Sequence, residues 1–288
     1  MSARSEWSIS EPEKLTFDGP VSALNVRVVG GTVNVVGTDS GPARLELSAL
    51  DGPPLTVALE DGALTVAYDD LPWKGLLKWL DRKGWNRSVH LTLTVPTATD
   101  VSIGVIGASA VASGIGGRAE LRGVSGDFTL VGLTGPVRAD TVSGRVEAQA
   151  VTGDLRFNSV SGDLTVVEGS GPGVRAESVS GNVVLDLAPV SESARISLNT
   201  VSGEIAIRLP HPADAKVDAE VDANTASGSV SCAFEDLRVT GQWGAKRING
   251  TLGTGSGRLQ ATTVSGAIAL LRRPRSEDDT YGSQGKVL

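Results

Sequence analysis

The sequence predicts an all-β protein, a single-stranded β-solenoid of roughly 18–22-residue coils with one short amphipathic helix inserted in its N-terminal part. One observation is a recurring phrase: an acidic or amide residue, a hydroxyl residue, Val, Ser and Gly. Its closing glycine recurs at positions 126, 144, 162, 181 and 203. A short, nearly fixed period indicates units that stack only on their neighbours. A second observation is composition, because 36 glycines and 4% aromatic residues favour short strands joined by tight turns.

Residues 1–14 are polar, and we expect them to be a flexible lead-in. Residues 15–100 predict an N-terminal β section in which Gly30-Gly31 and Asp61-Gly62 each supply a hairpin turn. Val89–Val95 alternates apolar and polar residues and predicts one more strand, which ends at Pro96.

A helix is predicted over residues 71–83. Asp70 precedes it, Pro72 lies in its first turn and Gly84 follows it, which are helix start and stop signals. The apolar side chains recur at spacings of three and four residues, so they share one face. They are Trp73, Leu76, Leu77 and Leu80.

This helix is the compositional outlier of an acidic chain, because it concentrates basic residues and, with its flank, three of the five tryptophans. One interpretation is structural: the helix covers a strand edge or an end of the solenoid. Another is that residues 71–87 contact a membrane surface, or that the helix docks on a protein partner. The candidate membrane- or partner-binding residues are Trp73, Lys74, Leu76, Leu77, Lys78, Trp79, Leu80, Arg82, Lys83 and Trp85.

The regular solenoid is expected over residues 101–271. Its recurring glycines predict sharp turns with positive φ, and the preceding Ser or Thr can bond the turn backbone. After Gly203 the spacing becomes irregular, which predicts longer and shorter turns in the later coils. Residues 272–288 lack apolar periodicity, and we expect a disordered tail there.

The residues that follow the repeat glycines should stack on one another in successive coils and form a structural ladder. Because a basic residue falls between two acidic ones, we expect alternating charges to stabilise the register by ~0.2–1 kcal/mol per pair. The ladder residues are Asp127, Arg145, Asp163, Asn182 and Glu204.

Most chemistry is not signalled by the sequence. His90 and His211 lack metal-ligand spacing, Cys232 is the one cysteine, and no phosphate-binding glycine loop precedes a helix. We therefore expect no metal, no cofactor and no small-molecule ligand. The net charge of −7 argues against nucleic acid as a partner. The alternative to a non-enzymatic scaffold is a polysaccharide-acting β-helix enzyme with carboxylates on adjacent coils, for which the candidates are Asp127, Asp154 and Asp163.

The expected location is the cytoplasm, with peripheral attachment to the inner face of the membrane through the predicted helix. Residues 1–13 do not read as a secretory signal, and no run of about 18 apolar residues is present.

Three stretches carry a resemblance to a known family: Gly30–Gly37, Leu91–Pro96 and the serial Val-Ser-Gly phrases. Together they resemble the bacterial putative-adhesin β-strand-repeat family, a toastrack-like domain of unknown function, over roughly residues 15–271. The resemblance implies a β-solenoid, in some members joined to membrane segments and linked to envelope-stress systems. It transfers no catalytic residue. We therefore expect a non-enzymatic scaffold that binds a protein partner or its own kind.

Overall fold

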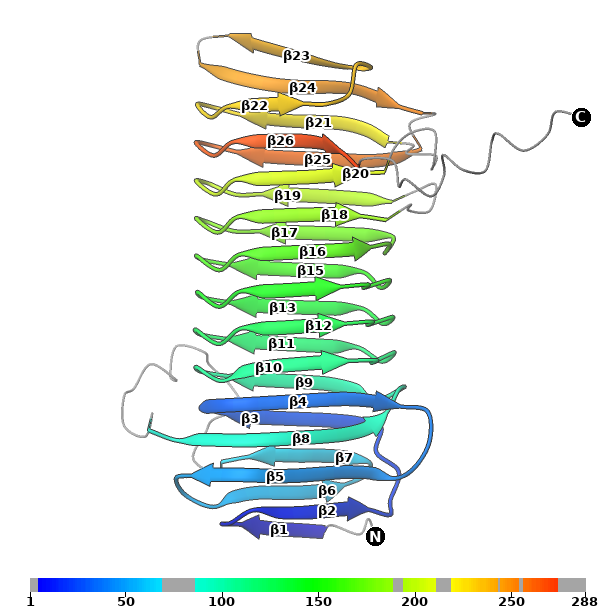
Figure 1. Ribbon diagram of the computed structural model, residues 1–288, viewed down its shortest axis with the longest axis vertical. Helices are drawn as coiled ribbons and strands as arrows, with labels where there is room; N and C mark the ends of the chain where they lie inside the picture. Colours follow the sequence, from blue (N-terminus) through cyan, green and yellow to red (C-terminus); the bar gives the residue numbers. More distant parts are fainter. Residues whose placement is uncertain are drawn as a thin grey trace, which may run out of the picture.

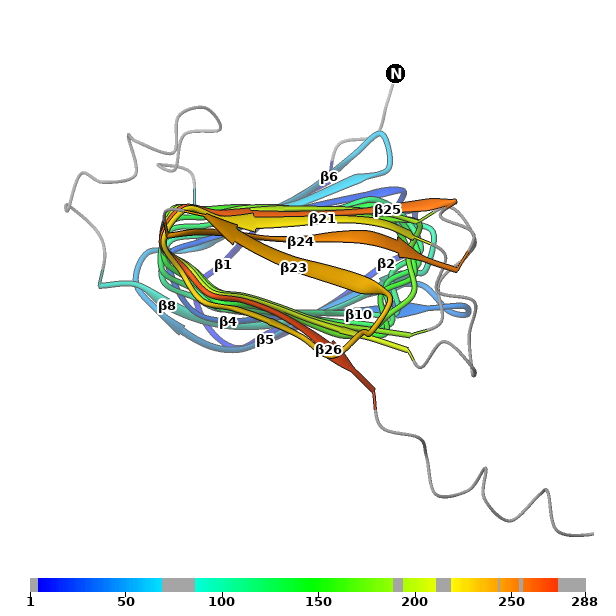
Figure 2. The ribbon, with the colours of Figure 1, turned by 90° about the horizontal axis from the view of Figure 1, so that it is seen from above.

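The computed structural model describes residues 5–68, 86–188, 194–210, 219–242, 244–253 and 256–273. Within these ranges the protein contains strands and no helix. Two long sheets face each other across one thin core (Figures 1 and 2). The predicted all-β class is confirmed, whereas the predicted helix over residues 71–83 lies outside the described residues.

The first sheet has 14 strands. Their spatial order is β1 (Ser5–Ile9), β6 (Leu55–Glu60), β7 (Ala63–Ala67), β3 (Ala23–Val28), β9 (Asp100–Val105), β11 (Ala119–Gly123), β13 (Val137–Thr141), β15 (Leu155–Ser159), β17 (Gly173–Glu177), β19 (Arg195–Asn199), β25 (Gly257–Thr263), β21 (Ala219–Thr225), β24 (Ala245–Leu252) and β23 (Leu237–Gln242).

The second sheet has 12 strands. Their spatial order is β2 (Glu13–Phe17), β5 (Ala43–Asp51), β8 (Ser88–Pro96), β4 (Gly30–Thr38), β10 (Ser109–Ser113), β12 (Phe128–Val131), β14 (Val146–Gln149), β16 (Leu164–Gly169), β18 (Val183–Leu187), β20 (Ile205–Leu209), β26 (Ile268–Arg272) and β22 (Val230–Cys232).

From β9 to β20 the chain alternates between the sheets, so that one strand from each sheet forms a rung. Each strand pairs in parallel with its counterpart on the next rung, as Val137 does with Leu155 and Val146 with Leu164. The alternation of apolar and polar residues along each strand places every second side chain in the core. The rungs therefore stack about 4.8 Å apart in register, as the period predicted.

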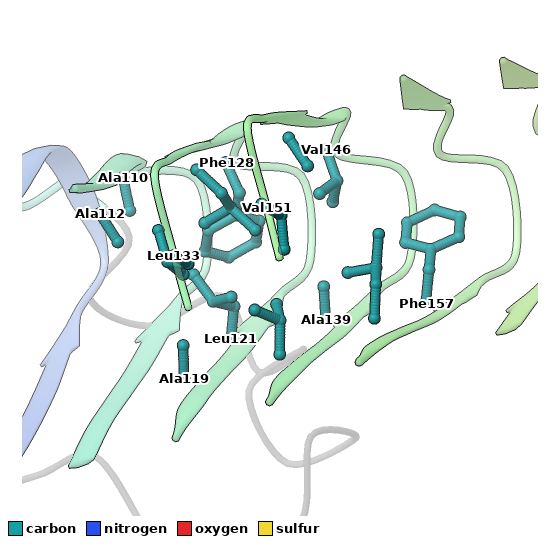
Figure 3. Close-up of a cluster of buried hydrophobic side chains, with 14 of the residues drawn as sticks. Ala110, Ala112, Ala119, Leu121, Phe128, Leu133, Ala139, Val146, Val151 and Phe157 are labelled. Carbon is teal, nitrogen blue, oxygen red and sulfur yellow. The ribbon is translucent and has the colours of Figure 1, made fainter. Parts of the chain in front are cut away.

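The core is filled by large side chains set between small ones. Phe157 is fully buried, and its in-register neighbours on the adjacent rungs are Ala139 and Ala176. Phe128 is likewise buried between Ala110 and Val146 (Figure 3). This alternation of large and small side chains fits the rings into a thin core.

At both ends of the stack the spatial order of the rungs differs from their order in the sequence. The rung of β3 and β4 lies between the rung of β7 and β8 and that of β9 and β10. The rung of β25 and β26 likewise lies between that of β19 and β20 and that of β21 and β22. The irregular glycine spacing after residue 203 reflects, in part, an exchange of rung order that the sequence did not predict. The connection from β20, which ends at Leu209, to β21, which begins at Ala219, is also longer than that from β14 to β15, which agrees with the expectation of longer turns.

Two further expectations for the N-terminal section were wrong. Residues 5–9 form strand β1, antiparallel to β6, where a flexible lead-in was expected over residues 1–14; strand β2, antiparallel to β5, begins at Glu13, inside that range, and continues into the predicted β section. Trp7 packs edge-on against Phe17 at this end, with 5.4 Å between ring centroids. Gly30-Gly31 is a corner between the two sheets, because β3 belongs to the first sheet and β4 to the second. The hairpin predicted around Asp61-Gly62 is present as the antiparallel pair β6–β7.

The repeat glycines serve a different purpose from the predicted one. Among the described residues, none of the glycines at 126, 144, 162, 181 and 203 has a positive φ. A Cβ at Gly144 would instead lie 1.9 Å from the carbonyl oxygen of Gly126 on the preceding rung. The same contact recurs along the stack, so the phrase needs glycine because stacked turns approach closely at this point.

Candidate binding surface

The Val-Ser-Gly turns are locked by two sets of hydrogen bonds. The hydroxyl residue before the valine of each phrase accepts the N–H of the glycine three residues later, over 2.6–3.1 Å, as Thr141 does from Gly144. The serine before the glycine donates its hydroxyl to a carbonyl one rung away, as Ser143 does to Val124 at 3.1 Å. Because both polar side chains are used inside the turn, the valine between them is left facing outward.

These valines form a continuous apolar column along one corner of the stack. One valine comes from each successive rung, about 4.8 Å from the next. Their exposed fractions run from 36 to 51%, which is high for large apolar residues. We call this set the valine column: Val142, Val160, Val179, Val201 and Val264.

The sequence analysis did not identify this column. The signal was present, because an apolar residue recurs at a fixed position inside a turn, outside the alternation of any strand. A residue there cannot point into a core that the strands on both sides already fill.

The five ladder residues lie beside the valine column and immediately precede the strands of the second sheet. Phe128, Val146, Leu164, Val183 and Ile205, the residues that follow them, are paired in register. Asp127, Arg145, Asp163, Asn182 and Glu204 therefore occupy equivalent positions on successive rungs.

The ladder is joined differently from the expected alternation of charges. Asp127 accepts the backbone N–H of Arg145 at 2.8 Å, Asp163 that of Asn182 at 2.7 Å, and Asn182 that of Glu204 at 2.9 Å. The Arg145 guanidinium lies 3.7 Å from Glu147, two residues further along the chain. Short side chains that bond the next rung's backbone hold this edge, and the expected Arg–Asp pairing was wrong.

The carboxylates considered for catalysis are separated by the fold. Asp154 precedes β15, and Asp163 follows the turn at the far end of the same strand, so roughly 16 Å of strand lies between them. Asp127 and Asp163 stand two rungs apart, roughly 10 Å, and each bonds a backbone N–H.

The described residues contain neither a metal-binding group of side chains nor a membrane-spanning helix. No group of three or more His, Cys, Asp or Glu side chains there could hold a metal ion. His90 Nδ1 lies 2.7 Å from the Thr32 hydroxyl, and His211 is outside the described residues. None of the described residues forms a helix long and apolar enough to cross a bilayer.

The candidate residues of the predicted helix lie outside the described residues, so they stay predictions. They are Trp73, Lys74, Leu76, Leu77, Lys78, Trp79, Leu80, Arg82, Lys83 and Trp85. The described flank contains Arg87, whose guanidinium lies 5.2 Å from the centre of the buried Tyr68 ring.

The outer face of the first sheet contrasts with the valine column because its charges are paired along the strands. Arg122 binds Glu120 at 2.5 Å, and Arg175 binds Glu177 at 2.5 Å. Arg138 binds Asp140 at 2.7 Å, and this hydrogen-bonded carboxylate raises the pKa of Arg138. On these three rungs the charges are paired along the strand, whereas the valine column carries no charge.

Comparisons with known proteins place the chain among toastrack domains. The family model described as Toastrack DUF4097 matches residues 107–271. A comparison with curated proteins finds none that matches.

Two solved structures are similar. One is described as a putative adhesin from Bacteroides fragilis, with 12% identity, a TM-score of 0.48, and coverage of 94% of this chain and 97% of that one. The other is described as a putative cell adhesion protein from Clostridium sporogenes, with 12% identity, a TM-score of 0.26, and coverage of 95% and 100%.

Proposed function

Because the chain belongs to the Toastrack DUF4097 family, a domain of unknown function whose model spans more than half of it, we propose that it is a non-enzymatic scaffold that binds a protein partner through the valine column. The observation that carries this proposal is the row of half-exposed valines at one corner of successive rungs. Contiguous exposed apolar surface in a folded protein marks interaction sites.

The chemistry of the column favours an uncharged apolar protein surface as the partner. Burying the remaining half of each valine contributes roughly 1 kcal/mol. The neighbouring serine hydroxyls already donate to carbonyls across the turns, so covering them leaves no donor unpaired. The stacked backbone also fixes the spacing, so little ordering entropy is lost on binding.

The structural use of the carboxylates supports a non-enzymatic function. A polysaccharide-cleaving site needs two carboxyl groups about 5–9.5 Å apart and free to act. Asp127 and Asp163 each accept a backbone hydrogen bond, and Asp154 stands at the opposite end of the rung from Asp163.

The experiment starts with partner capture from the native host and continues with titration of the purified partner. Changing Val160, Val179 and Val201 to Ser should weaken binding by tenfold or more, because three apolar contacts are lost. The matched control changes Val111, Val131 and Val167, which are 36–39% exposed on the second sheet, to Ser. Equal affinity of the corner variant and wild type would refute the proposal, and a wild type that captures only itself would identify a second copy as the occupant.

A second candidate function, attachment to the inner face of the cytoplasmic membrane, is motivated by the tryptophans and basic residues of 71–87. Co-sedimentation with anionic liposomes tests it, with Trp73, Leu77 and Trp79 changed to Ser as the comparison. Wild type that stays in the supernatant would end this candidate.

A further inference from the structure

The last strand of the first sheet, β23, has one edge without a partner strand in the part of the chain that the structure describes. It pairs with β24 on one side, from Leu237 opposite Gly250 to Gln242 opposite Ala245. No strand among the described residues pairs with its other side. Figure 1 shows β23 as the outermost strand at this end of the stack. Its outward N–H and C=O groups are therefore a template for another strand.

The two ends of the stack differ in how their edge strands are protected. The edge strands at the opposite end, β1 and β2, carry Glu6, Glu13 and Lys14. Such charges are the usual device against edge-to-edge pairing. Strand β23 carries one charge, Arg238, and Val239 on it is 52% exposed.

Val239 lies on the core-facing side of the first sheet, but the described residues leave its side chain half exposed. It stands directly opposite Ile248 of β24, which is fully buried, and residues directly opposite in an antiparallel pair share a face. Val239 therefore lies on the core side of the sheet. The second sheet ends there in the three-residue strand β22 (Figure 1), so this side chain is left uncovered by the described residues.

We propose that β23 pairs antiparallel with β23 of a second copy of this chain, forming a two-fold dimer joined end to end. Because directly opposite residues share a face, the symmetric pairing must be centred on a residue. Centred on Val239, it packs two valines together and sets Arg238 opposite the partner's Thr240. Centred on Arg238, it would oppose two guanidinium groups, which like-charge repulsion disfavours.

The dimer goes beyond the proposed function because it uses the end of the stack and not its corner. It closes with two-fold symmetry, so it stops at two copies. Two six-residue strands bury less than a standard interface, which predicts a concentration-dependent dimer with a micromolar dissociation constant. The valine columns of the two copies would then lie on one doubled stack.

Sedimentation velocity of the full chain across the micromolar range tests the dimer. Val239→Lys sets two ammonium groups opposite each other and should abolish association, while Val184→Lys on the outer face of the second sheet, 42% exposed in wild type, should leave it intact. Circular dichroism melts confirm that both variants fold.

A charge pair at one position tests the register. Thr240→Glu sets a carboxylate opposite the partner's Arg238 on both sides and should tighten the dimer, while Thr240→Lys should loosen it, each by about 2- to 30-fold for two cross-strand pairs. A monomer at all concentrations overturns the proposal. So does equal behaviour of the Glu and Lys variants, or a dimer lost in Val184→Lys and kept in Val239→Lys.

Discussion

The middle of the stack and its two ends are built from the same kind of rung, but the chain orders those rungs differently. From β9 to β20 each rung follows the previous one in sequence, and each turn joins neighbours. At the ends, β3 and β4 lie inside β7 and β8, and β25 and β26 lie inside β21 and β22. A rung in the middle has two neighbours close in sequence, whereas an end rung depends on segments returning from far along the chain.

This difference predicts which parts of the stack should unfold cooperatively. In repeat proteins, stability is close to a sum of terms within each unit and at each interface between neighbours. Damage in the middle breaks two interfaces and divides the stack. Damage at an end removes one interface and should stay local.

Two glycines with the same close contact test this directly. A Cβ at Gly144 would lie 1.9 Å from the carbonyl oxygen of Gly126, and a Cβ at Gly228 would lie 1.9 Å from that of Gly266. We expect Gly144→Ala to lower the free energy of unfolding by on the order of 3 kcal/mol or more, because backbone on the neighbouring rung must move. Thermal melts should show a large loss, and hydrogen exchange should rise on both sides of the turn.

Gly228→Ala places the same clash in the last rungs. Faster hydrogen exchange should be confined to the C-terminal rungs, from β21 to β26, because the clash is with Gly266 between β25 and β26, and the middle rungs should stay protected as in wild type. If both variants lose protection throughout the stack, the ends are as cooperative as the middle and the comparison fails.

The same contrast explains what the sequence could predict. The regular glycine spacing identified the rungs, because each middle rung contacts a neighbour about 18 residues away. The order of the rungs at the ends was not predictable from the sequence. The phrase Thr263-Val264-Ser265-Gly266 would be identical whether its rung were the last of the stack or lay between two earlier rungs, as it does. The role of the glycines was missed because a period does not distinguish positive φ from close approach. The valine column was missed because hydroxyl capping, not hydrophobicity, decides which way that valine points.

One ion-pair cluster fastens the middle of the stack to its C-terminal end. Asp186 on β18 binds Arg208 on β20, and Arg273, which follows β26, binds Asp186 at 2.7 Å. Burial of the carboxyl opposes its ionisation, but hydrogen bonds from both arginines outweigh that effect and lower the pKa of Asp186. The side chain is only 9% exposed, so the pairs are partly shielded from water.

Asp186→Asn should therefore cost about 1.5–3 kcal/mol of stability at neutral pH, since hydrogen bonds to charged groups are lost. Because the pKa in the folded protein is below that of the unfolded chain, about 3.9, this contribution is complete above pH 4–5 and is lost as pH falls through the folded-state value. Denaturant unfolding from neutral to acidic pH should show the two proteins converging at low pH. Asp140→Asn, which breaks an exposed pair on the first sheet, is the control and should cost no more than about 1 kcal/mol. A gap that persists unchanged at low pH would contradict the assignment.

The smallest expected effect lies at the turns opposite the valine column. Gly114 and Gly132 have φ values of 65° and 63°, and Ala150, at the equivalent position one rung on, has a φ of 53°. Their backbone N–H groups bond the next rung in the same way, to Val131, Gln149 and Val167.

Ala150→Gly should relieve the left-handed conformation and raise stability by about 1 kcal/mol, partly offset by the greater freedom of glycine in the unfolded chain. The melting temperature should rise by about 2–4 °C. The control is Ala148→Gly, a buried strand position where φ is not positive, which should lower the melting temperature instead. If both substitutions lower the melting temperature, contacts with adjacent rungs matter more than the local φ for the choice of residue at position 150, even in the regular middle of the stack.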